Sequence, residues 1–264
     1  MSAPAPAATA RGTLYLVPAP LDFGCDTQMP LQHSLPDATL ATAARLTHWV
    51  CENAKSARAY LKRVDAVHPL ALPLQEQSIT ELPREVHKKG DHGGKGAAVF
   101  DARPLLAAAV AGHDIGLVSE AGMPAVADPG SSVVRAAHEL GIAVVPLVGP
   151  VSLLLALAAS GLSGQSFAFV GYLPQDPDER AQRIRALENL ALKSGQTQLF
   201  IETPYRNAAL LQALLHTLQP ATRLSVSSGL TLASGHTCSQ SVQQWRHRPA
   251  GPDKHTPAVF AIGR

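Results

Sequence analysis

The sequence has 264 residues, of which 46% are hydrophobic and 5% aromatic, and its formal net charge is +2 at pH 7. This length and composition exclude a largely disordered chain and predict one large or two small domains. The charge neither indicates nor excludes a nucleic-acid partner. Three widely spaced cysteines without a CxxC pattern argue against a disulfide framework or a metal site, and they fit a reducing compartment.

Residues 1–11 are rich in Ala and Pro and lack both the apolar core and the early positive charge of a signal peptide. We expect a disordered tail. The run Ile142–Leu162 is uncharged and long enough to span a bilayer. However, Pro146, Gly149 and Pro150 divide it into a strand, a turn and a helix, so the sequence predicts no membrane span.

The remaining chain reads as strands and helices in alternation. Strands are expected at 13–17, 48–51, 115–118, 142–147, 167–171, 198–202, 224–227 and 258–262, and helices at 37–46, 53–64, 98–111, 132–140, 152–160, 176–193 and 205–218. Residues 65–96 read as irregular, and 228–242 as a hairpin-like region. The alternation predicts an α/β protein with a parallel-rich N-terminal sheet (12–148) and a mixed C-terminal sheet (149–264).

Four of the expected strands end in turns rich in Gly and Pro. They are VPAP (17–20), SEAGMP (119–124), LVGPVS (147–152) and GYLP (171–174). Ligands of open α/β sheets lie outside the carboxyl ends of the strands. Each turn alone is explained by simple strand-to-helix linkage, but four together favour a ligand site. None matches GxGxxG, GxxxxGKS or GxSxG, so the residues alone predict only a small molecule held largely by backbone groups.

The longest of these connections, Ser119-Glu-Ala-Gly-Met-Pro…Asp128-Pro-Gly130, resembles the tetrapyrrole methylase superfamily when it is read with the later Gly149-Pro150. Within that superfamily it is most similar to the bacterial enzymes that 2′-O-methylate a ribose of 16S ribosomal RNA. Leu14–Pro20, Gly171–Pro174, Glu202–Arg206 and Pro257–Gly263 match in order and spacing. The resemblance covers residues 12–263. It implies two α/β domains with S-adenosylmethionine in the cleft between them.

The resemblance also implies the residues that contact the cofactor. They are Pro20, Leu21, Ala121, Gly122, Met123, Val126, Val151, Ser152, Ile201, Glu202 and Ala258. Leu21, Val126 and Ala258 have an equally good explanation as core residues. Asp128 is expected to cap the following helix, with Pro129 in its first turn.

Glu52, Lys55, Glu202 and Arg206 are the candidates for orienting the acceptor or handling its proton. Each has a structural alternative, since Lys55 can belong to a solvated helix face and Glu202 can form a local ion pair with Arg206. No metal is expected. The resemblance implies a cytoplasmic homodimer acting on the 30S subunit.

The sequence departs from the ribosomal enzymes at three places. Their Thr-Pro-Ile-Gly-Asn-Leu is Ala19–Gly24 here, their Glu-Asp-Thr-Arg is Glu52–Lys55, and their Glu-Leu-Thr-Lys is Gly229–Leu232, with no acid or Lys nearby. A divergent acceptor is therefore an open alternative. So are methylation of a tetrapyrrole or other small molecule, and cofactor binding without turnover. Whether 65–96 forms a mobile lid is also open.

Overall fold

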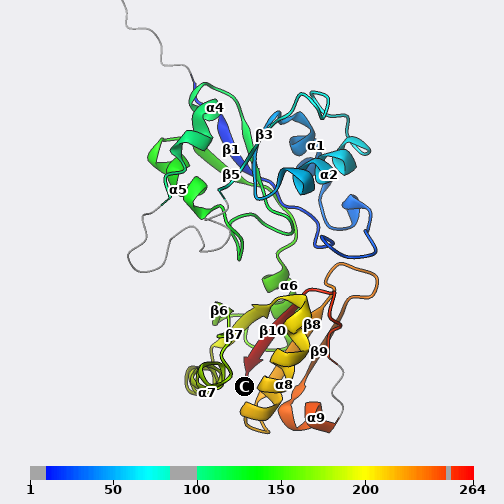
Figure 1. Ribbon diagram of the computed structural model, residues 1–264, viewed down its shortest axis with the longest axis vertical. Coiled ribbons are helices and arrows are strands. Elements are labelled where there is room, and N and C mark those ends of the chain that lie inside the picture. The colour runs from blue at the N-terminus through cyan, green and yellow to red at the C-terminus, as the bar shows by residue number, and fades with distance from the viewer. Residues whose placement is uncertain (1–9, 84–99, 248–250) are drawn as a thin grey trace, which may run out of the picture. The chain divides into compact units, whose positions relative to one another are not determined.

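A computed structural model describes residues 10–83, 100–247 and 251–264. The chain forms two compact units (Figure 1). Unit 1 comprises the chain up to Pro20 together with Pro30–Pro150, and unit 2 comprises Leu21–Met29 together with Val151–Arg264. Each unit contains one five-stranded sheet.

Unit 1 is an α/β unit built on a parallel sheet. Its strands are β1 (Thr13–Leu16), β2 (His48–Cys51), β3 (Ser78–Glu81), β4 (Ile115–Val118) and β5 (Ala143–Pro146). They lie in the order β3-β2-β4-β1-β5, and every pairing is parallel. Its helices are η1 (Leu31–His33), α1 (Asp37–Arg45), α2 (Ala54–Asp65), η2 (Arg103–Leu106), α4 (Ala107–Val110) and α5 (Ser131–Glu139).

The sheet of unit 1 is buried on both faces, as parallel sheets usually are. One cluster of buried side chains contains Leu40 of α1 and Leu61 of α2, and a second contains Leu106 of η2 and Val133 of α5. Gly116 of β4 makes this packing possible, because a Cβ atom there would lie 2.5 Å from the Trp49 ring. The central strand therefore needs a glycine at this position.

Unit 2 has a mixed sheet. Its strands are β6 (Phe167–Tyr172), β7 (Thr197–Glu202), β8 (Arg223–Ser228), β9 (His236–Ser241) and β10 (Ala258–Gly263). The order is β6-β7-β10-β8-β9, with β6 and β7 parallel and the other pairs antiparallel. Its helices are α6 (Ser152–Ser160), α7 (Pro177–Ser194), η3 (Pro204–Arg206), α8 (Asn207–Thr217) and α9 (Val242–His247).

Helices cover both faces of the second sheet. Side chains of α7, α8 and α9 pack with Phe200 and Phe260 on one face, whereas Leu153 and Leu157 of α6 pack with Leu199 and Val259 on the other. The expected fold class, a parallel-rich N-terminal sheet followed by a mixed C-terminal sheet, is confirmed.

Three sequence-based expectations for the elements were wrong. Residues 65–96 were expected to be irregular, but 78–81 form β3, an edge strand that sequence patterns miss because Ile79 is its one apolar residue. In place of a continuous helix at 98–111, Arg103 begins the 3₁₀ helix η2, which has Pro104 in its first turn and leads into the one-turn α4. After the β8–β9 hairpin, 242–247 form the unexpected helix α9.

Parts of several expectations lie outside the described residues. They are the tail at 1–9, residues 84–96 of the possible lid, and 98–99 of the expected helix. No helix in the described ranges combines the length and apolarity needed to cross a membrane.

Candidate active site

Two loops are joined by hydrogen bonds at the carboxyl edge of the unit 1 sheet. The backbone N–H of Ala19, just after β1, donates to the carbonyl of Gly122, 2.9 Å away, and the N–H of Gly122 donates back to the carbonyl of Ala19 at 3.0 Å. The first loop is anchored by the Val17 N–H, which donates to the Leu117 carbonyl. The connection that follows β4 is therefore held against the one that follows β1.

The loop at 119–130 has an unusual backbone. Ala125 and Ala127 have φ angles of 64° and 66°, and Gly122 and Gly130 also have positive φ angles. Non-glycine residues adopt this region at a cost of about 1–3 kcal/mol, and such residues cluster at functional sites. Ser119 is buried, and its Oγ has no hydrogen-bond partner among the residues that the structure describes. The loop therefore combines strain with an unsatisfied polar atom.

Three carboxylates from two connections interact at the same edge. They are Glu52 after β2, Glu120 after β4, and Asp128 before α5. Burial, and then the negative charges of Glu52 and Glu120, raise the pKa of Asp128 to about 7. The edge therefore carries concentrated negative charge, which favours a cationic ligand.

Asp128 does not cap α5, contrary to expectation. The helix begins at Ser131, its N-cap is Gly130 with a φ of 134°, and Asp128 stands two residues earlier. Pro129 and Gly130 lie between the acid and the first residue of the helix. Asp128 is thereby placed in the acidic group instead of at the helix terminus.

The start of α2 is tied to this acidic edge by three side chains. Asn53 is the N-cap, and its Oδ1 accepts hydrogen bonds from the backbone N–H groups of Lys55 and Ser56. The Ala54 N–H donates to Oε1 of Glu81 at 2.6 Å, and the Ser56 hydroxyl donates to Oε1 of Glu120 at 3.3 Å. The first turn of α2 is therefore fixed beside the strained loop.

The cofactor residues predicted in unit 1 all lie at the joined loops. Pro20 and Gly122 are buried, and Ala121 and Met123 are partly exposed. Val126 is 40% exposed, so the core explanation for it fails. Glu52 is partly buried at the same edge, whereas Lys55 lies exposed on α2.

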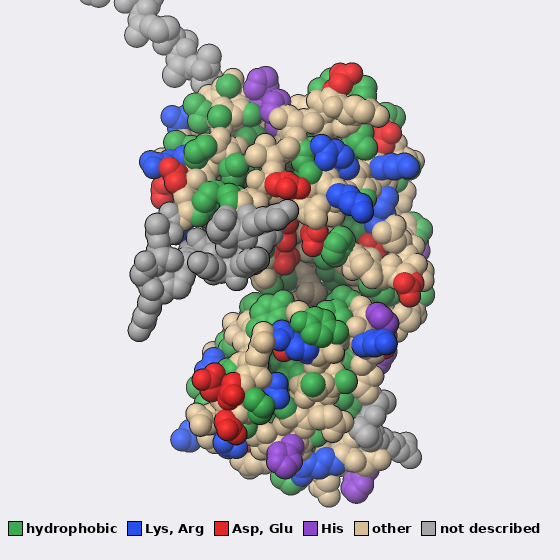
Figure 2. Space-filling view, in the orientation of Figure 1, with side chains coloured by type: hydrophobic (Ala, Val, Ile, Leu, Met, Phe, Trp, Pro, Cys, Tyr) green, Lys and Arg blue, Asp and Glu red, His purple; other side chains and the backbone are tan. Residues whose placement is uncertain are grey.

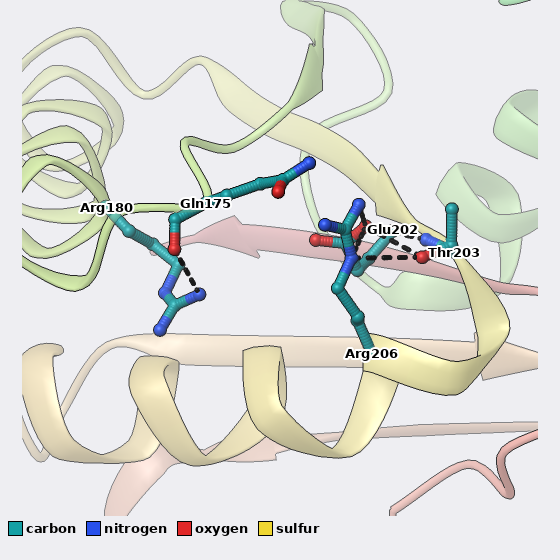
Figure 3. Close-up of polar contacts among 5 residues, drawn as sticks. All are labelled: Gln175, Arg180, Glu202, Thr203 and Arg206. Carbon is teal, nitrogen blue, oxygen red and sulfur yellow. Dashed lines mark hydrogen bonds and ion pairs between the residues drawn. The ribbon is translucent and has the colours of Figure 1, made fainter.

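In unit 2 the structure brings Glu202 and Arg206 together (Figure 3). Arg206 Nη2 lies 2.9 Å from Glu202 Oε1, and the Glu202 side chain is only 4% exposed. The Thr203 N–H and hydroxyl also donate to this oxygen. Tyr205 is 70% exposed, and the Arg206 guanidinium lies 5.4 Å from its ring centre. The local ion pair considered from the sequence is present, with an exposed tyrosine beside it.

The other predicted contacts in unit 2 are in varied surroundings. Val151 and Ser152 are partly exposed at the start of α6. Ile201 and Glu202 end β7, and Glu202 is paired with Ala258 at the start of β10. Ala258 is 5% exposed and belongs to the core of unit 2, in agreement with the explanation of it as a core residue. Leu21 is partly exposed.

Sequence reasoning overlooked Glu120, Asp128 and the buried Ser119 hydroxyl as members of this site. Their signal was positional, because Ser119 and Glu120 directly follow a buried strand that ends at the ligand-binding edge of an α/β sheet. Within the described ranges, no group of three or more His, Cys, Asp or Glu residues has an arrangement that would hold a metal ion.

The chain matches the family model for Tetrapyrrole (Corrin/Porphyrin) Methylases over residues 54–242. It is 31% identical over 226 residues to the Ribosomal RNA small subunit methyltransferase I of Mesorhizobium japonicum, a match that covers 86% of this chain and 66% of that protein. To the protein of the same name from Halalkalibacterium halodurans it is 32% identical over 196 residues, which is 74% of this chain and 57% of the relative. The chain thus spans less than two thirds of the length of these relatives.

Solved structures show the same fold. The uroporphyrin-III-C-methyltransferase of Thermus thermophilus aligns with a TM-score of 0.53 and 20% identity, over 96% of this chain and 94% of that one. The methyltransferase CobJ aligns with a TM-score of 0.55 and 17% identity over the same shares. The match to the family model over residues 54–242 covers more than half of the chain, and the parallel sheet is consistent with it. The chain belongs to the tetrapyrrole methylase family.

Proposed function

We propose that this protein is an S-adenosylmethionine-dependent methyltransferase whose acceptor is small-subunit ribosomal RNA. The observation that carries the proposal is the strained 119–130 loop, bonded through Gly122 to Ala19 at the carboxyl edge of a parallel sheet. An edge of this kind is where α/β folds bind small ligands. The relatives' names supply the acceptor class.

The residues of unit 1 fit this cofactor chemically. Ala121 and Gly122 have small side chains that allow the backbone to approach a ligand closely. The Ser119 hydroxyl is a buried polar atom that a ligand would satisfy. The charges of Glu52, Glu120 and Asp128 are complementary to the positive sulfonium. When bound, S-adenosylmethionine supplies an activated methyl group.

We propose that Pro20, Ala121, Gly122, Met123 and Val126 contact the cofactor. The contacts predicted in unit 2, namely Leu21, Val151, Ser152, Ile201, Glu202 and Ala258, stay predictions. Because the sulfonium sulfur is itself a good leaving group and departs as a neutral thioether, the protein's task is to orient the acceptor and exclude water.

A ribose hydroxyl has a very high pKa, so its methylation benefits from a proton acceptor. Glu52 is our candidate, because it lies at the carboxyl edge close enough to Asp128 for its charge to help raise the pKa of that group to about 7. A proton taken up here would be held among neighbouring carboxylates. We assign Glu202 to holding Arg206, since the carboxylate is buried and already accepts several hydrogen bonds.

Calorimetric titration with S-adenosylmethionine tests the cofactor assignment. We expect saturable 1:1 binding per chain, weakened when Gly122 is replaced by Val, because a branched side chain would project from a buried loop position with a φ of 72°. Gly164→Val is the control, since a Cβ atom at Gly164 meets nothing within 4 Å. Absence of binding at millimolar ligand would refute the proposal.

Transfer of a labelled methyl group tests the acceptor. The recipient is the 30S subunit from a strain that lacks its own ribosomal RNA methyltransferase I, and nuclease digestion locates the label on ribose. Label on a tetrapyrrole substrate instead would support the small-molecule alternative. Cofactor binding with neither transfer would support a binding protein without turnover. We further propose a cytoplasmic homodimer, which sedimentation of the full chain would test.

A further inference from the structure

The solvent-exposed face of α2 is cationic along its length. Lys55, Arg58 and Lys62 are exposed, whereas Ala57, Tyr60, Leu61 and Val64 are buried against the sheet. Positions 55, 58 and 62 are spaced by three and four residues, so their side chains lie on one face. Figure 2 shows Lys and Arg side chains gathered over the part of unit 1 where Figure 1 places α2.

These three cations lack carboxylate partners among the residues that the structure describes. Within the described part of the chain, the Arg58 guanidinium donates to the Ala54 carbonyl of its own helix, at 3.4 Å. Two other arginines of unit 1 have carboxylate partners, since Arg45 lies 2.8 Å from Asp114 and Arg103 lies 2.8 Å from Asp101. Unpaired cations arranged in a row leave a positive potential that an extended polyanion would neutralise.

The position of the helix connects this row to the candidate active site. Through Ser56, the first turn of α2 is hydrogen-bonded to Glu120 of the strained loop. From Lys55 the row extends seven residues to Lys62, about 10 Å at 1.5 Å per residue. The carboxylates of Glu52, Glu120 and Asp128 repel phosphate, so a nucleic-acid backbone would lie along the helix and leave an uncharged ribose to approach the edge.

We propose that Lys55, Arg58 and Lys62 form a phosphate-binding surface that holds the backbone of the RNA acceptor. This inference rests on the proposed function and goes beyond it by naming the surface that binds the substrate. It gives Lys55 a different role from proton handling, because an exposed, strongly hydrated ammonium group is suited to contacting a phosphate. The row contacts the backbone and positions the RNA without reading its sequence.

The test replaces Lys55, Arg58 and Lys62 together by Gln, which keeps helix propensity and removes the charge. Binding of fluorescein-labelled single-stranded RNA is measured by anisotropy across a range of salt concentrations. We expect affinity to fall on the order of tenfold or more, and the slope of log affinity against log salt to become shallower by about 2, at roughly 0.7 per lost phosphate contact. The KM for 30S subunits should rise by a similar factor, with kcat little changed.

A matched control removes the same charge from another helix. Arg183, Arg185 and Lys193 of α7 are also exposed, and their triple replacement by Gln should leave RNA affinity and the salt slope near those of the parent protein. A second variant, Lys55→Arg with Lys62→Arg, keeps the charge and should bind RNA normally. Circular dichroism and calorimetry with S-adenosylmethionine confirm that each variant is folded and binds the cofactor.

The outcomes separate this proposal from the function on which it rests. If the parent protein binds S-adenosylmethionine and methylates 30S subunits, while the α2 variant binds RNA as the parent does, the surface is elsewhere and only this inference fails. If the parent binds no RNA at low salt, the inference fails together with the RNA acceptor. If the triple Gln variant of α2 binds RNA as the parent does but no longer binds vesicles of anionic lipid, the surface binds a membrane and the inference is also overturned.

Discussion

At the scale of single residues, the loops at the carboxyl edge depend on close packing that leaves room only for glycine. Gly149 lies after β5, and a Cβ atom built on it would be 2.3 Å from Cγ and 2.5 Å from Cβ of the Pro18 ring. Pro18 begins the loop that is bonded to Gly122. Gly149 therefore allows two of the Gly/Pro-rich connections to pack together.

Replacing Gly149 by Ala should lower the free energy of unfolding by about 1–3 kcal/mol, because a rigid ring and not a flexible side-chain end occupies the space. Urea denaturation measures the effect. Gly164→Ala is the control, since a Cβ atom at Gly164 would have no neighbour within 4 Å and the stability should be unchanged or slightly greater. Equal midpoints for the two variants would contradict the packing argument.

Asp128 predicts a pH dependence of stability. Its pKa rises from 3.8 to about 7 on folding, so the folded state binds the proton more tightly than the unfolded state. Ionisation therefore opposes folding, and the contribution of Asp128 to stability falls as the pH rises from about 4 to about 7. Asp128→Asn, which cannot ionise, should equal the parent near pH 4 and exceed it by up to about 4 kcal/mol at pH 8.

Denaturation by urea at several pH values checks this prediction. Asp101→Asn is the control, because the hydrogen bonds from Arg103 lower the pKa of the exposed Asp101. That variant should show no gain at high pH. A gain for Asp128→Asn that is the same at pH 4 and pH 8 would show that ionisation is not the cause.

At the scale of elements, α2 connects the core, the acidic edge and the cationic face. Its buried side chains fix its orientation, and Asn53 and Glu81 satisfy the backbone N–H groups at its start. Those groups would otherwise lack partners in the first turn. The face that the helix turns outward is thereby determined by the face that it buries.

Asn53→Ala should destabilise the protein by about 1 kcal/mol, because it removes the side-chain acceptor at the N-cap. Asn53→Asp keeps an acceptor oxygen and is expected to retain most of the stability. Thermal denaturation of both variants measures the difference. If both variants have the same melting temperature, and it is lower than that of the parent, the hydrogen bonds to the N-cap side chain are not what stabilises this turn.

At the scale of the whole molecule, the fold and the net charge place few limits on the acceptor. The formal charge of +2 is nearly neutral, yet the cations on α2 and the acids at the carboxyl edge are separated in unit 1. Local charge, and not total charge, therefore decides which ligands approach. A solved structure named as a uroporphyrin-III-C-methyltransferase has the same fold, so the fold alone does not select RNA.

S-adenosylhomocysteine should raise the melting temperature of the full chain, since a ligand that binds only the folded state stabilises it by about 2.7 kcal/mol at 100 times its Kd. Differential scanning calorimetry at increasing ligand concentrations measures the shift. The Gly122→Val variant should need more ligand for the same shift. No shift at millimolar concentration would contradict the assigned cofactor class.

Local patterns in the sequence determined the class of the fold and pointed to the edge where we propose that ligand binds. The apolar runs 115–118 and 198–202 predicted strands, and β4 and β7 occupy them. The Gly/Pro-rich turns predicted the loops at the carboxyl ends, because glycine and proline restrict or permit particular backbone angles wherever they occur. Because these signals depend only on neighbouring residues, they can be read from the sequence without knowledge of tertiary contacts.

Only the tertiary structure decided which residues meet. Glu52 follows β2, whereas Glu120 and Asp128 belong to the connection after β4, and the parallel pairing of β2 with β4 is what brings these two connections to one edge. The pKa of Asp128 depends on those neighbours and on burial, neither of which a sequence pattern records. The same is true of β3, whose strand conformation comes from pairing with β2, since its own residues offer little apolar surface. Composition and periodicity describe what each segment prefers, whereas proximity between distant segments arises only when the chain packs.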